Sequence, residues 1–509
     1  MMNLLLKHEI LNLLKTGRVY LTIITFLLLF MTVFTVRVMD YQKTLNQYIA
    51  DVRINDEQLQ AAENFSFLNP RAIQQPIIFS IYHEGFNFSR VVDIIFYNPI
   101  IQTTSLHTEI NILDRENSKL DITFLITFFL SLFILLITYD SVNGEKQNGT
   151  LRLFMTYPLK RQNFIIKKVL GVFVLVIFTF TIPYLLSMIC LIVKYSTLLS
   201  VSFFHSIFFY WFVVMLFVFS FSLLGVLISC FTSNPNRSLV YSLLIWFLLI
   251  IILPISWDYI VSPRVYKNRL DNLQINYQVK LREFNQAMNN PPEGSNPREG
   301  DWAYLDGYFY NTTVLSLFSN GYEGRLNFQK YVYDFVFPIS KEVEMSMDEL
   351  LRVRINKDKI RTRAFFYNPV VLLNDLATKI TGNSREDHLR FLQDSRGLRN
   401  EIINQGIYEG WLWDNRFFAR FDRDIDDTIV NDFFAGNLDF DGFYSALMNF
   451  LEHTPRFEME VPNLSRYEQP NQTFSEIFQY IVPNLAFFML IIIVLWVVTW
   501  QVFLKYDVR

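Results

Sequence analysis

This sequence has very few of the residues that cross-link small secreted proteins or bind catalytic metals. Its 509 residues include two cysteines and six histidines, and only 18% are charged. Both cysteines, Cys190 and Cys230, lie inside long hydrophobic runs, so the polar segments contain no thiol. Disulfide bonds and cysteine-based metal sites in those segments are therefore excluded, and the histidines are too scattered to suggest a metal cluster.

The chain also lacks the common short motifs of catalytic sites. No GxxxxGK[ST] sequence is present, so the chain is not expected to bind and hydrolyse ATP itself. HExxH and GxSxG are absent as well, which argues against a zinc hydrolase and a serine hydrolase. A formal net charge of −3 gives no reason to expect nucleic-acid binding. We expect a non-catalytic protein without a cofactor or metal of its own.

Hydrophobic residues, in contrast, make up 51% of the chain, and 51 residues are phenylalanine. A helix needs roughly 20 mainly apolar residues to cross a bilayer. Six segments meet this requirement, which predicts a polytopic α-helical membrane protein with six transmembrane helices. The predicted spans are residues 19–36, 122–139, 169–193, 203–231, 239–257 and 481–504.

Lysine and arginine cluster at one set of span ends, and this predicts the orientation of the chain. The basic residues are Lys7, Lys15, Arg18, Lys146, Arg152, Lys160, Arg161, Lys167, Lys168, Arg237, Lys505 and Arg509. Both termini, the loop 140–168 and the tail 505–509 are therefore predicted to be cytoplasmic. Residues 37–121 and 258–480 become two large, mainly helical extracytoplasmic insertions. The first hydrophobic run is too long for a signal peptide and is expected to remain as an anchor.

Helical periodicity continues beyond the spans into both insertions. Tyr41, Leu45, Tyr48 and Val52 extend the first span outward, and Leu270 to Met288 shows the same spacing after the fifth. We expect these two stalk helices to pack against one another. Consecutive prolines and glycines after Asn289 should end the second one. The aromatic stretches 304–310 and 332–337 are candidates for strands.

Two further patterns are weaker. Asn437, Asp439, Asp441 and Gly442 match the start of a calcium loop, but the twelfth position is Met448 instead of glutamate, so turn chemistry on an acidic surface is the preferred interpretation. The neighbouring carboxylates at 422, 424, 426 and 427 lack the required glycine. The tetrapeptide FYNP occurs at 96–99 and again at 366–369, but the flanking residues do not align.

The loop 140–168 has the composition of a docking element. Leu151, Leu153, Phe154 and Tyr157 form an apolar patch beside the charged Glu145. Such a patch suits a groove on the surface of a partner protein. The alternative is a helix on the membrane surface that only anchors the loop.

The segment YDSVNGEKQNGTLRLFMTYPLKR resembles the signature of ABC type-2 exporter permeases. The resemblance implies that it is the coupling helix that docks onto an ATPase. The matching positions are Glu145, Gly149, Thr150, Leu151, Leu153, Phe154, Tyr157, Pro158 and Arg161. Residues 1–18 are similar to the amphipathic elbow helix of these permeases, with Leu4, Ile10, Leu11 and Leu14 on its apolar face. The sequence from Asn368 to Ile402 resembles an insertion found in a subgroup with large extracytoplasmic segments.

The resemblance also implies partners and a function. Such permeases bind separate ABC ATPase subunits, and ATP and magnesium bind to those subunits. The permeases also pair with a second permease copy or with a sibling permease. The implied function is movement of a substrate across the cytoplasmic (inner) membrane of a bacterium. A competing hypothesis is a non-transporting mechanotransmitter or scaffold that acts on an envelope partner through its external domains. The substrate is not defined by the sequence.

Overall fold

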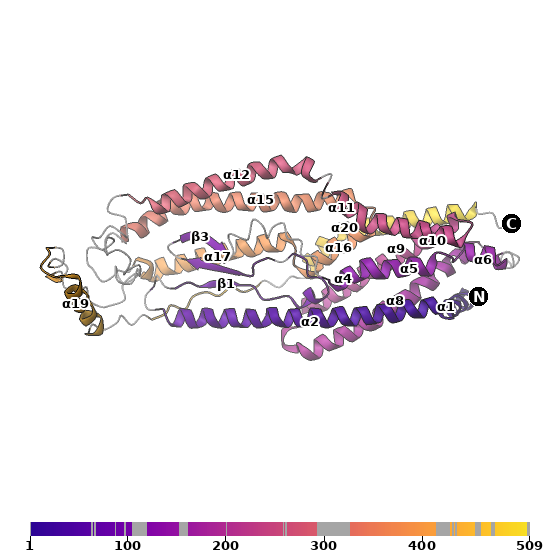
Figure 1. Ribbon diagram of the computed structural model, residues 1–509, viewed down its shortest axis with the longest axis horizontal. Coiled ribbons are helices and arrows are strands. Elements are labelled where there is room, and N and C mark those ends of the chain that lie inside the picture. The colour runs from indigo at the N-terminus through magenta and orange to yellow at the C-terminus, as the bar shows by residue number, and fades with distance from the viewer. Residues whose placement is uncertain are drawn as a thin grey trace.

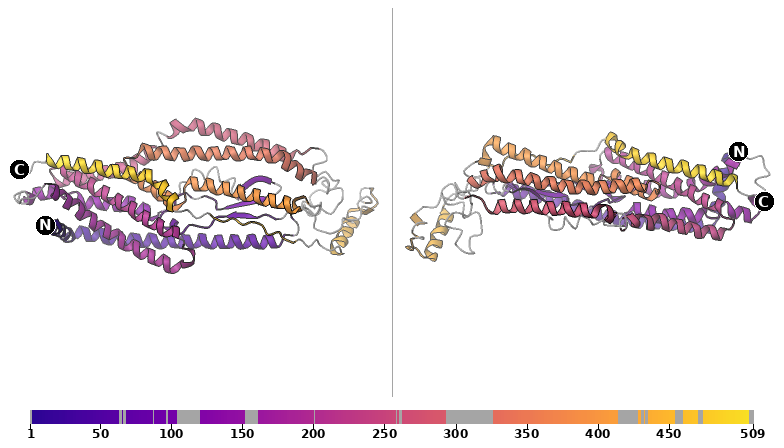
Figure 2. Two further views of the ribbon diagram at one scale, coloured as in Figure 1. Left: turned by 180° about the vertical axis from the view of Figure 1, so that it is seen from behind. Right: turned by 90° about the horizontal axis from the view of Figure 1, so that it is seen from above.

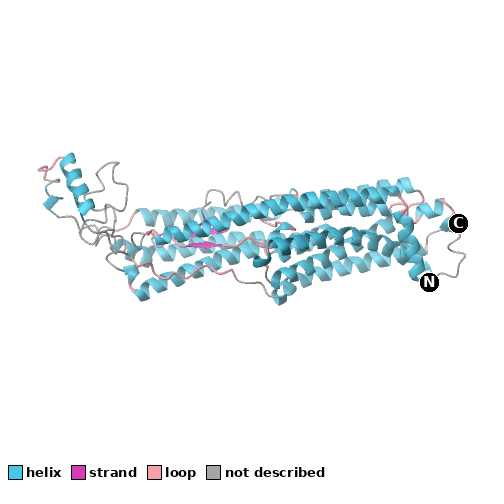
Figure 3. Ribbon diagram, turned by 90° about the horizontal axis from the view of Figure 1, so that it is seen from below, coloured by secondary structure: helices cyan, strands magenta, loops and turns pink. Residues whose placement is uncertain are grey.

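In the residues that it describes, the computed structural model is mostly helical and has one small sheet (Figure 3). It describes residues 2–62, 65, 68–86, 88–95, 98–103, 120–151, 161–199, 201–257, 259, 262–292, 326–413, 428–429, 432, 435–453, 460–469 and 474–505.

The molecule is elongated, and both chain ends lie at the same end of it (Figure 1). We call this the terminal end; it contains α1 (Met2–Leu14) and α6 (Asn143–Gln147). In the part of the chain that the structure describes, six helices are long and apolar enough to cross a membrane, as the sequence predicts. They contain α2 (Gly17–Gln60), α4 (Ile122–Leu125) with η3 (Ile126–Leu130) and α5 (Ser131–Thr138), α8 (Arg161–Lys194), α9 (Val201–Phe231), α10 (Pro235–Phe247) with η5 (Leu248–Ile252) and α11 (Leu253–Ser256), and α20 (Phe474–Leu504).

Helix α2 continues without a break beyond its apolar half, as the periodicity from Tyr41 to Val52 predicts. Its 44 residues span about 66 Å at about 1.5 Å per residue, roughly twice the thickness of the bilayer hydrocarbon. Tyr41 and Leu45 are buried in the polar half, so that half packs on the rest of the chain. A single rigid element therefore connects the membrane part to the opposite end of the molecule.

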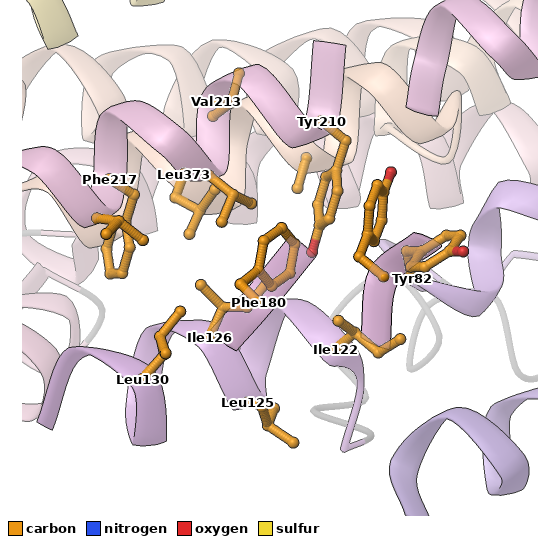
Figure 4. Packing of buried hydrophobic residues seen from close by; sticks show 14 of the residues in the cluster. Tyr82, Ile122, Leu125, Ile126, Leu130, Phe180, Tyr210, Val213, Phe217 and Leu373 are labelled. Atoms are coloured by element: carbon orange, nitrogen blue, oxygen red, sulfur yellow. The ribbon is translucent and has the colours of Figure 1, made fainter. Parts of the chain in front are cut away.

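The helices of the membrane part enclose a hydrophobic core in which three tyrosines lie close together (Figure 4). The ring centroids of Tyr82 and Tyr184 are 5.1 Å apart, and those of Tyr82 and Tyr210 are 6.0 Å apart. The hydroxyl of Tyr82 shares a hydrogen bond with Ser187 (2.8 Å), and that of Tyr210 shares one with Thr123 (2.9 Å). Because these polar atoms are satisfied, the aromatic rings can be buried at little cost.

Helix α16 (Pro369–Thr381) belongs to this same core, although it lies within the predicted insertion 258–480. It packs against α9 and α20 and buries Leu372, Leu373 and Leu376 completely. Its N-cap residue is Asn368, whose side-chain amide also donates to the carbonyl of Leu249 in η5 (2.8 Å). With 13 residues, α16 is too short to cross the bilayer, and the length test for spans does not detect it.

Beyond the membrane part lies what we call the distal part, which consists of a three-stranded antiparallel sheet, three long helices and the polar half of α2. The sheet has the order β1 (Arg71–Ile73), β2 (Val91–Ile95), β3 (Asn98–Thr103). The helices are α12 (Ser262–Asn289), α15 (Phe337–Ala364) and α17 (Arg385–Glu409). Val92 and Ile94 of β2 pack with Leu351 of α15 and Ile402 of α17 in a second hydrophobic core.

The predicted stalk pairing is wrong. Helix α12 packs along α15, and α2 lies on the opposite side of the distal part (Figure 2). Tyr277 and Phe284 of α12 are buried against Val343 and Leu350 of α15. The periodicity from 270 to 288 correctly predicts a helix ending at Asn289, but it cannot specify which partner covers the apolar face.

The strand prediction for 332–337 is also wrong. Residues Val332–Val336 form the π-helical segment η8, which continues directly into α15. Val332 and Val336, four residues apart, are both buried. This spacing fits one face of a helix better than the alternation of apolar and polar residues that a strand requires. The other candidate strand, 304–310, lies outside the described residues.

In the candidate calcium loop, the polar side chains serve local turns. Asp439, just before α19 (Phe440–His453), accepts a hydrogen bond from the backbone N–H of Gly442 (2.8 Å) in the manner of an N-cap. Asn437 donates to Asp432 (3.1 Å). The carboxylates at 422, 424, 426 and 427 lie outside the described residues.

His388 of α17 is expected to make the stability of the distal part depend on pH. Its ring stacks on Phe88 with centroids 4.1 Å apart, and burial lowers the pKa of His388 to about 4. Between about pH 4 and 6.5 the unfolded chain therefore binds a proton that the folded chain does not. Stability is retained above about pH 6.5 and lost as the pH falls toward 4, by about 3 kcal/mol in total. Thermal unfolding followed by tryptophan fluorescence from pH 4.5 to 7.5 should show this loss.

The variant His388→Phe keeps an aromatic ring against Phe88 and should flatten the pH profile. Carboxylates titrate in both proteins, so the difference between the two curves isolates His388. His453→Phe, at an exposed position in α19, is the matched control and should leave the profile unchanged. Equal slopes for His388→Phe and the unmodified protein would contradict this assignment.

Candidate functional site

The residues that the sequence singles out cluster around α6 at the terminal end (Figure 1). The structure describes five of them, namely Glu145, Gly149, Thr150, Leu151 and Arg161. The remaining predicted residues, Leu153, Phe154, Tyr157 and Pro158, lie outside the described residues. We call the contacts that attach α6 to the neighbouring helices the α6 junction.

The centre of the α6 junction is Lys168, near the start of α8. Its ammonium group donates to the carboxylate of Glu9 in α1 (2.9 Å) and to that of Glu145 in α6. Lys168 and Glu9 are each 4% exposed. Buried charges are tolerated only when they are paired and hydrogen-bonded. One lysine therefore joins three segments that are far apart in the sequence.

A glycine lets α1 approach α8 closely enough for this contact. A Cβ atom added at Gly171 would lie 2.7 Å from Cγ of Glu9. The face of α1 that packs on the bundle contains Glu9 and Leu13, whereas Leu11, on the predicted apolar face, is 47% exposed. Thr16 separates α1 from α2, with its hydroxyl donating to the carbonyl of Leu13 (2.6 Å).

A second ion pair attaches α2 to the segment just before α6. One guanidinium nitrogen of Arg18 lies 2.8 and 2.6 Å from the two carboxylate oxygens of Asp140, and the other donates to the hydroxyl of Tyr139 (2.9 Å). The guanidinium carbon also lies 5.1 Å from the centre of the Tyr139 ring. These contacts with Asp140 and Tyr139 together fix the orientation of the Arg18 side chain.

Helix α9 holds α6 through neutral hydrogen bonds. Ser229 accepts from the backbone N–H groups of Val142 (3.0 Å) and Asn143 (3.3 Å), which α6 itself leaves unsatisfied. The side-chain amide of Asn143 donates to Thr232 (2.8 Å), and Asn143 is fully buried. The start of α6 is thus fixed to α9, whereas its carboxylate is fixed to α8.

The end of α6 is exposed. Gly149 has a φ of +75°, a conformation that favours glycine, and reverses the chain after Asn148. The hydroxyl of Thr150 donates back to the carbonyl of Glu145 (3.1 Å), which stabilises the turn. Residues 147–150 are exposed. They are the surface of the α6 junction that another protein can reach.

Leu151 does not belong to that surface. It is fully buried in a cluster with Phe164 and Phe503, whose rings stack with centroids 5.5 Å apart. Arg161 donates to the carbonyl of Leu504 at the end of α20 (3.0 Å). Leu151 and Arg161 therefore bind the chain's own last helix, and any docking contact at the predicted patch depends on the other predicted residues.

The partners of Glu145 were not predicted from the sequence. Lys167 and Lys168 indicated only the orientation of the chain, and Glu9 was not singled out, yet all three side chains are buried. A glutamate in an otherwise apolar helical segment and two lysines at the start of a span are unusual enough to suggest pairing. What the residues cannot reveal is that they meet, because 159 positions separate Glu9 from Lys168.

Comparison of the sequence with known proteins indicates a family of membrane transporters. A family model described as "ABC-2 family transporter protein" matches residues 3–321, which include α1, α6 and five of the six candidate spans. The chain is also similar to the probable ABC transporter permease protein NosY of Pseudomonas aeruginosa, with 46% identity over 50 residues. That match covers 10% of this chain and 18% of the relative.

NosY of Stutzerimonas stutzeri is 45% identical over 47 residues, which cover 9% of this chain and 17% of the relative. The chain therefore matches less than a fifth of the length of either relative. The family match, in contrast, covers more than half of the 509 residues. The chain belongs to the ABC-2 family of transporter proteins, as a multi-pass membrane permease component.

Proposed function

We propose that this chain is the permease subunit of an ABC exporter in the bacterial cytoplasmic membrane, with the terminal end in the cytoplasm. ATP and magnesium would bind to separate ATPase subunits, and the permease would pair with a second copy or a sibling. The chain itself would perform no catalysis. The observation that carries the proposal is the α6 junction: Lys168 ties α6 to two other helices while residues 147–150 remain exposed.

The α6 junction suits the transmission of force. A push on the exposed turn would act on α8 through Glu145 and Lys168 and on α9 through Ser229. Asp140 and Arg18 would pass it to α2, which reaches the distal part. ATP-driven closure of the partner subunits would thereby bias the membrane helices between two arrangements.

The mechanotransmitter hypothesis uses the same junction. The uninterrupted α2 would carry motion to the distal part and to an envelope partner with or without transport. Family membership favours transport. Substrate movement in reconstituted vesicles distinguishes the two, because only a transporter would accumulate a substrate.

A large side chain placed on the exposed turn should prevent binding of the ATPase without unfolding the permease. Asn148 is exposed, so Asn148→Trp is expected to reduce recovery of the ATPase at least about tenfold in a pull-down from detergent-solubilised membranes, a cost of at least about 1.4 kcal/mol. The melting midpoint of the permease should stay the same. The measurement is the amount of ATPase recovered per permease, together with its ATP hydrolysis.

Asn268→Trp, at an exposed position of α12 in the distal part, is the matched control and should recover the ATPase fully. Glu145→Lys is a poorer test, because it would place a second cation against Lys168 and loosen the junction itself. An unchanged ATPase yield with Asn148→Trp would contradict the proposal that the ATPase binds at the exposed turn.

A further inference from the structure

A cavity of about 650 Å³ lies where the membrane part meets the distal part. Its walls come from η2 (Ile78–Ile81) and the residues just before it, the starts of α9 and α20, the end of α16, and α17. Figure 1 shows α16 and α17 in succession along the molecule, and α16 packs on both α9 and α20. The volume lies within the range of about 300 to 1,000 Å³ that is typical of sites for small organic ligands.

Helix α17 contributes most of the charged residues of this cavity from one of its faces. Asp387, Arg390 and Asp394 are three and four residues apart, so they lie on the same side of the helix. The start of α20 contributes Glu476. Among the described residues that line the cavity, these four carry the charged side chains, which are three carboxylates and one guanidinium. The lining therefore has two more negative charges than positive ones.

The guanidinium of Arg390 is engaged within the chain. It donates to the hydroxyl of Tyr480, and one of its nitrogens lies 3.7 Å from the carboxylate of Asp387. Arg390 therefore offsets Asp387, and the excess negative charge belongs to Asp394 and Glu476, which are exposed and mark the opening of the cavity. Partial burial raises the pKa of Asp394 although Arg390 acts in the opposite direction, so Arg390 does not fully compensate this charge.

Aromatic rings supply a second feature of the lining. They belong to Phe79, Phe203, Phe391, Tyr467 and Tyr480. The rings of Phe391 and Tyr467 meet edge to face with centroids 5.3 Å apart, and the guanidinium carbon of Arg390 lies 5.0 Å from the centre of the Tyr480 ring. The face of an aromatic ring attracts a cation. The contact between Arg390 and Tyr480 is an example of this attraction inside the cavity itself.

Two other cavities provide the contrast. The cavity of about 410 Å³ between α2 and the sheet is lined by three cations and three carboxylates, so its charges cancel. A cavity of about 350 Å³ is lined by five carboxylates, two lysines, two arginines and His83. Its two lysines are paired, because Lys359 lies 2.5 Å from Glu386 and Lys379 lies 2.9 Å from Asp375. The charges of both cavities are balanced or nearly balanced, unlike those of the 650 Å³ cavity.

We propose that the 650 Å³ cavity binds a bulky organic cation, with its charge toward Asp394 and Glu476 and its apolar body against the aromatic rings. Negative charge combined with aromatic faces is what recognises quaternary ammonium groups. Ile78 and Phe79 of the cavity wall also belong to the hydrophobic core of the membrane part, so the cation comes from a membrane amphiphile or from a soluble organic ion. Binding needs no ATPase, so its failure would leave the proposed function standing.

The first experiment measures binding of tetraphenylphosphonium to the purified full-length protein in nanodiscs, with empty nanodiscs as the background. Tetraphenylborate is the matched ion, because it has the same shape and the opposite charge. Saturable binding is expected for the phosphonium ion and not for the borate ion. Equal binding of the two ions, or no saturable binding of the phosphonium ion, overturns the proposal.

Two substitutions in α17 should change the affinity for tetraphenylphosphonium in opposite directions. Asp394→Asn removes an attracting charge and should weaken binding about threefold to tenfold, whereas Arg390→Gln removes a repelling charge and should strengthen it by a similar factor. Damage to the fold would weaken binding in both variants. Asp271→Asn makes the same change at an exposed position of α12 outside the cavity and should bind normally. Weaker binding by Arg390→Gln, or equal binding by Asp394→Asn and Asp271→Asn, contradicts the proposal.

A second experiment identifies the source of the cation. Tetrabutylammonium, a compact soluble ion, and decyltrimethylammonium, which carries one long apolar chain, compete with bound tetraphenylphosphonium. Stronger displacement by decyltrimethylammonium indicates that the site takes a membrane amphiphile, and stronger displacement by tetrabutylammonium indicates a soluble organic ion. If neither ion displaces tetraphenylphosphonium, the cavity does not select organic cations and the proposal is wrong.

Discussion

Replacing Lys168 by methionine is expected to destabilise the terminal end by about 3 to 5 kcal/mol and to abolish coupling to the ATPase. The substitution keeps most of the volume of the side chain but leaves the carboxylates of Glu9 and Glu145 close together without a cation. Because Glu9 is almost fully buried, it cannot recover its hydration by a small movement. The α6 helix should detach from α8, although Ser229 would still hold its start.

The measurements are the thermal midpoint of the purified protein and the rate of ATP hydrolysis with the ATPase bound. Adding Glu145→Gln to Lys168→Met removes one of the two unpaired charges and should restore part of the lost stability, so the two effects are not additive. Lys505→Met, an exposed lysine at the same end, is the control and should be neutral. A midpoint for Lys168→Met equal to that of the control would show that the contacts of Lys168 with Glu9 and Glu145 contribute nothing to stability.

The sequence predicted the membrane part well because each span satisfies its own local rule, an apolar run long enough to cross the bilayer. The continuation of α2 was predictable for the same reason, from spacing along a single helix. Helix α16 was not predictable, because it is short and its apolar residues are buried by α9 and α20, which are distant in sequence. The pairing of α12 with α15 was missed for the same physical reason.

The candidate site shows the same division. Glu145, Gly149 and Thr150 could be singled out because they form a local pattern, and the structure gives Gly149 the positive φ that favours glycine. The contacts that make Glu145 mechanically useful come from α1 and α8, and no local pattern specifies them. The local pattern therefore includes residues of the exposed turn, whereas the attachment of α6 to the bundle depends on residues that are distant in sequence.

A methyl group added at Gly225 is expected to be as damaging as the loss of Lys168, although no charge is involved. Helices α5 and α9 cross so closely there that a Cβ atom would lie 1.9 Å from the hydroxyl oxygen of Thr138 and 2.8 Å from its Cβ. Rotating the hydroxyl away would relieve only the first contact and would break its hydrogen bond to the carbonyl of Ile134 (2.8 Å). The helices must separate, at a cost of about 3 kcal/mol for Gly225→Ala.

That separation would also reach the α6 junction, since Ser229 lies one turn further along α9 and Asp140 lies two residues beyond Thr138. We therefore expect Gly225→Ala to lower both the thermal midpoint and the ATPase coupling. Gly397→Ala is the matched control: this glycine is inside α17 with open space around it, so alanine should be neutral or stabilise by up to about 1 kcal/mol.

Adding Thr138→Ala to Gly225→Ala should recover part of the loss, because it removes the 1.9 Å contact and leaves the one at 2.8 Å. Full recovery would mean that the hydroxyl alone caused the clash. No recovery would mean that the glycine is needed because the backbones of α5 and α9 approach too closely for any Cβ atom at position 225. If Gly225→Ala melts like Gly397→Ala, then α5 and α9 do not cross as closely as this packing requires, and the path from α9 to α6 must be reconsidered.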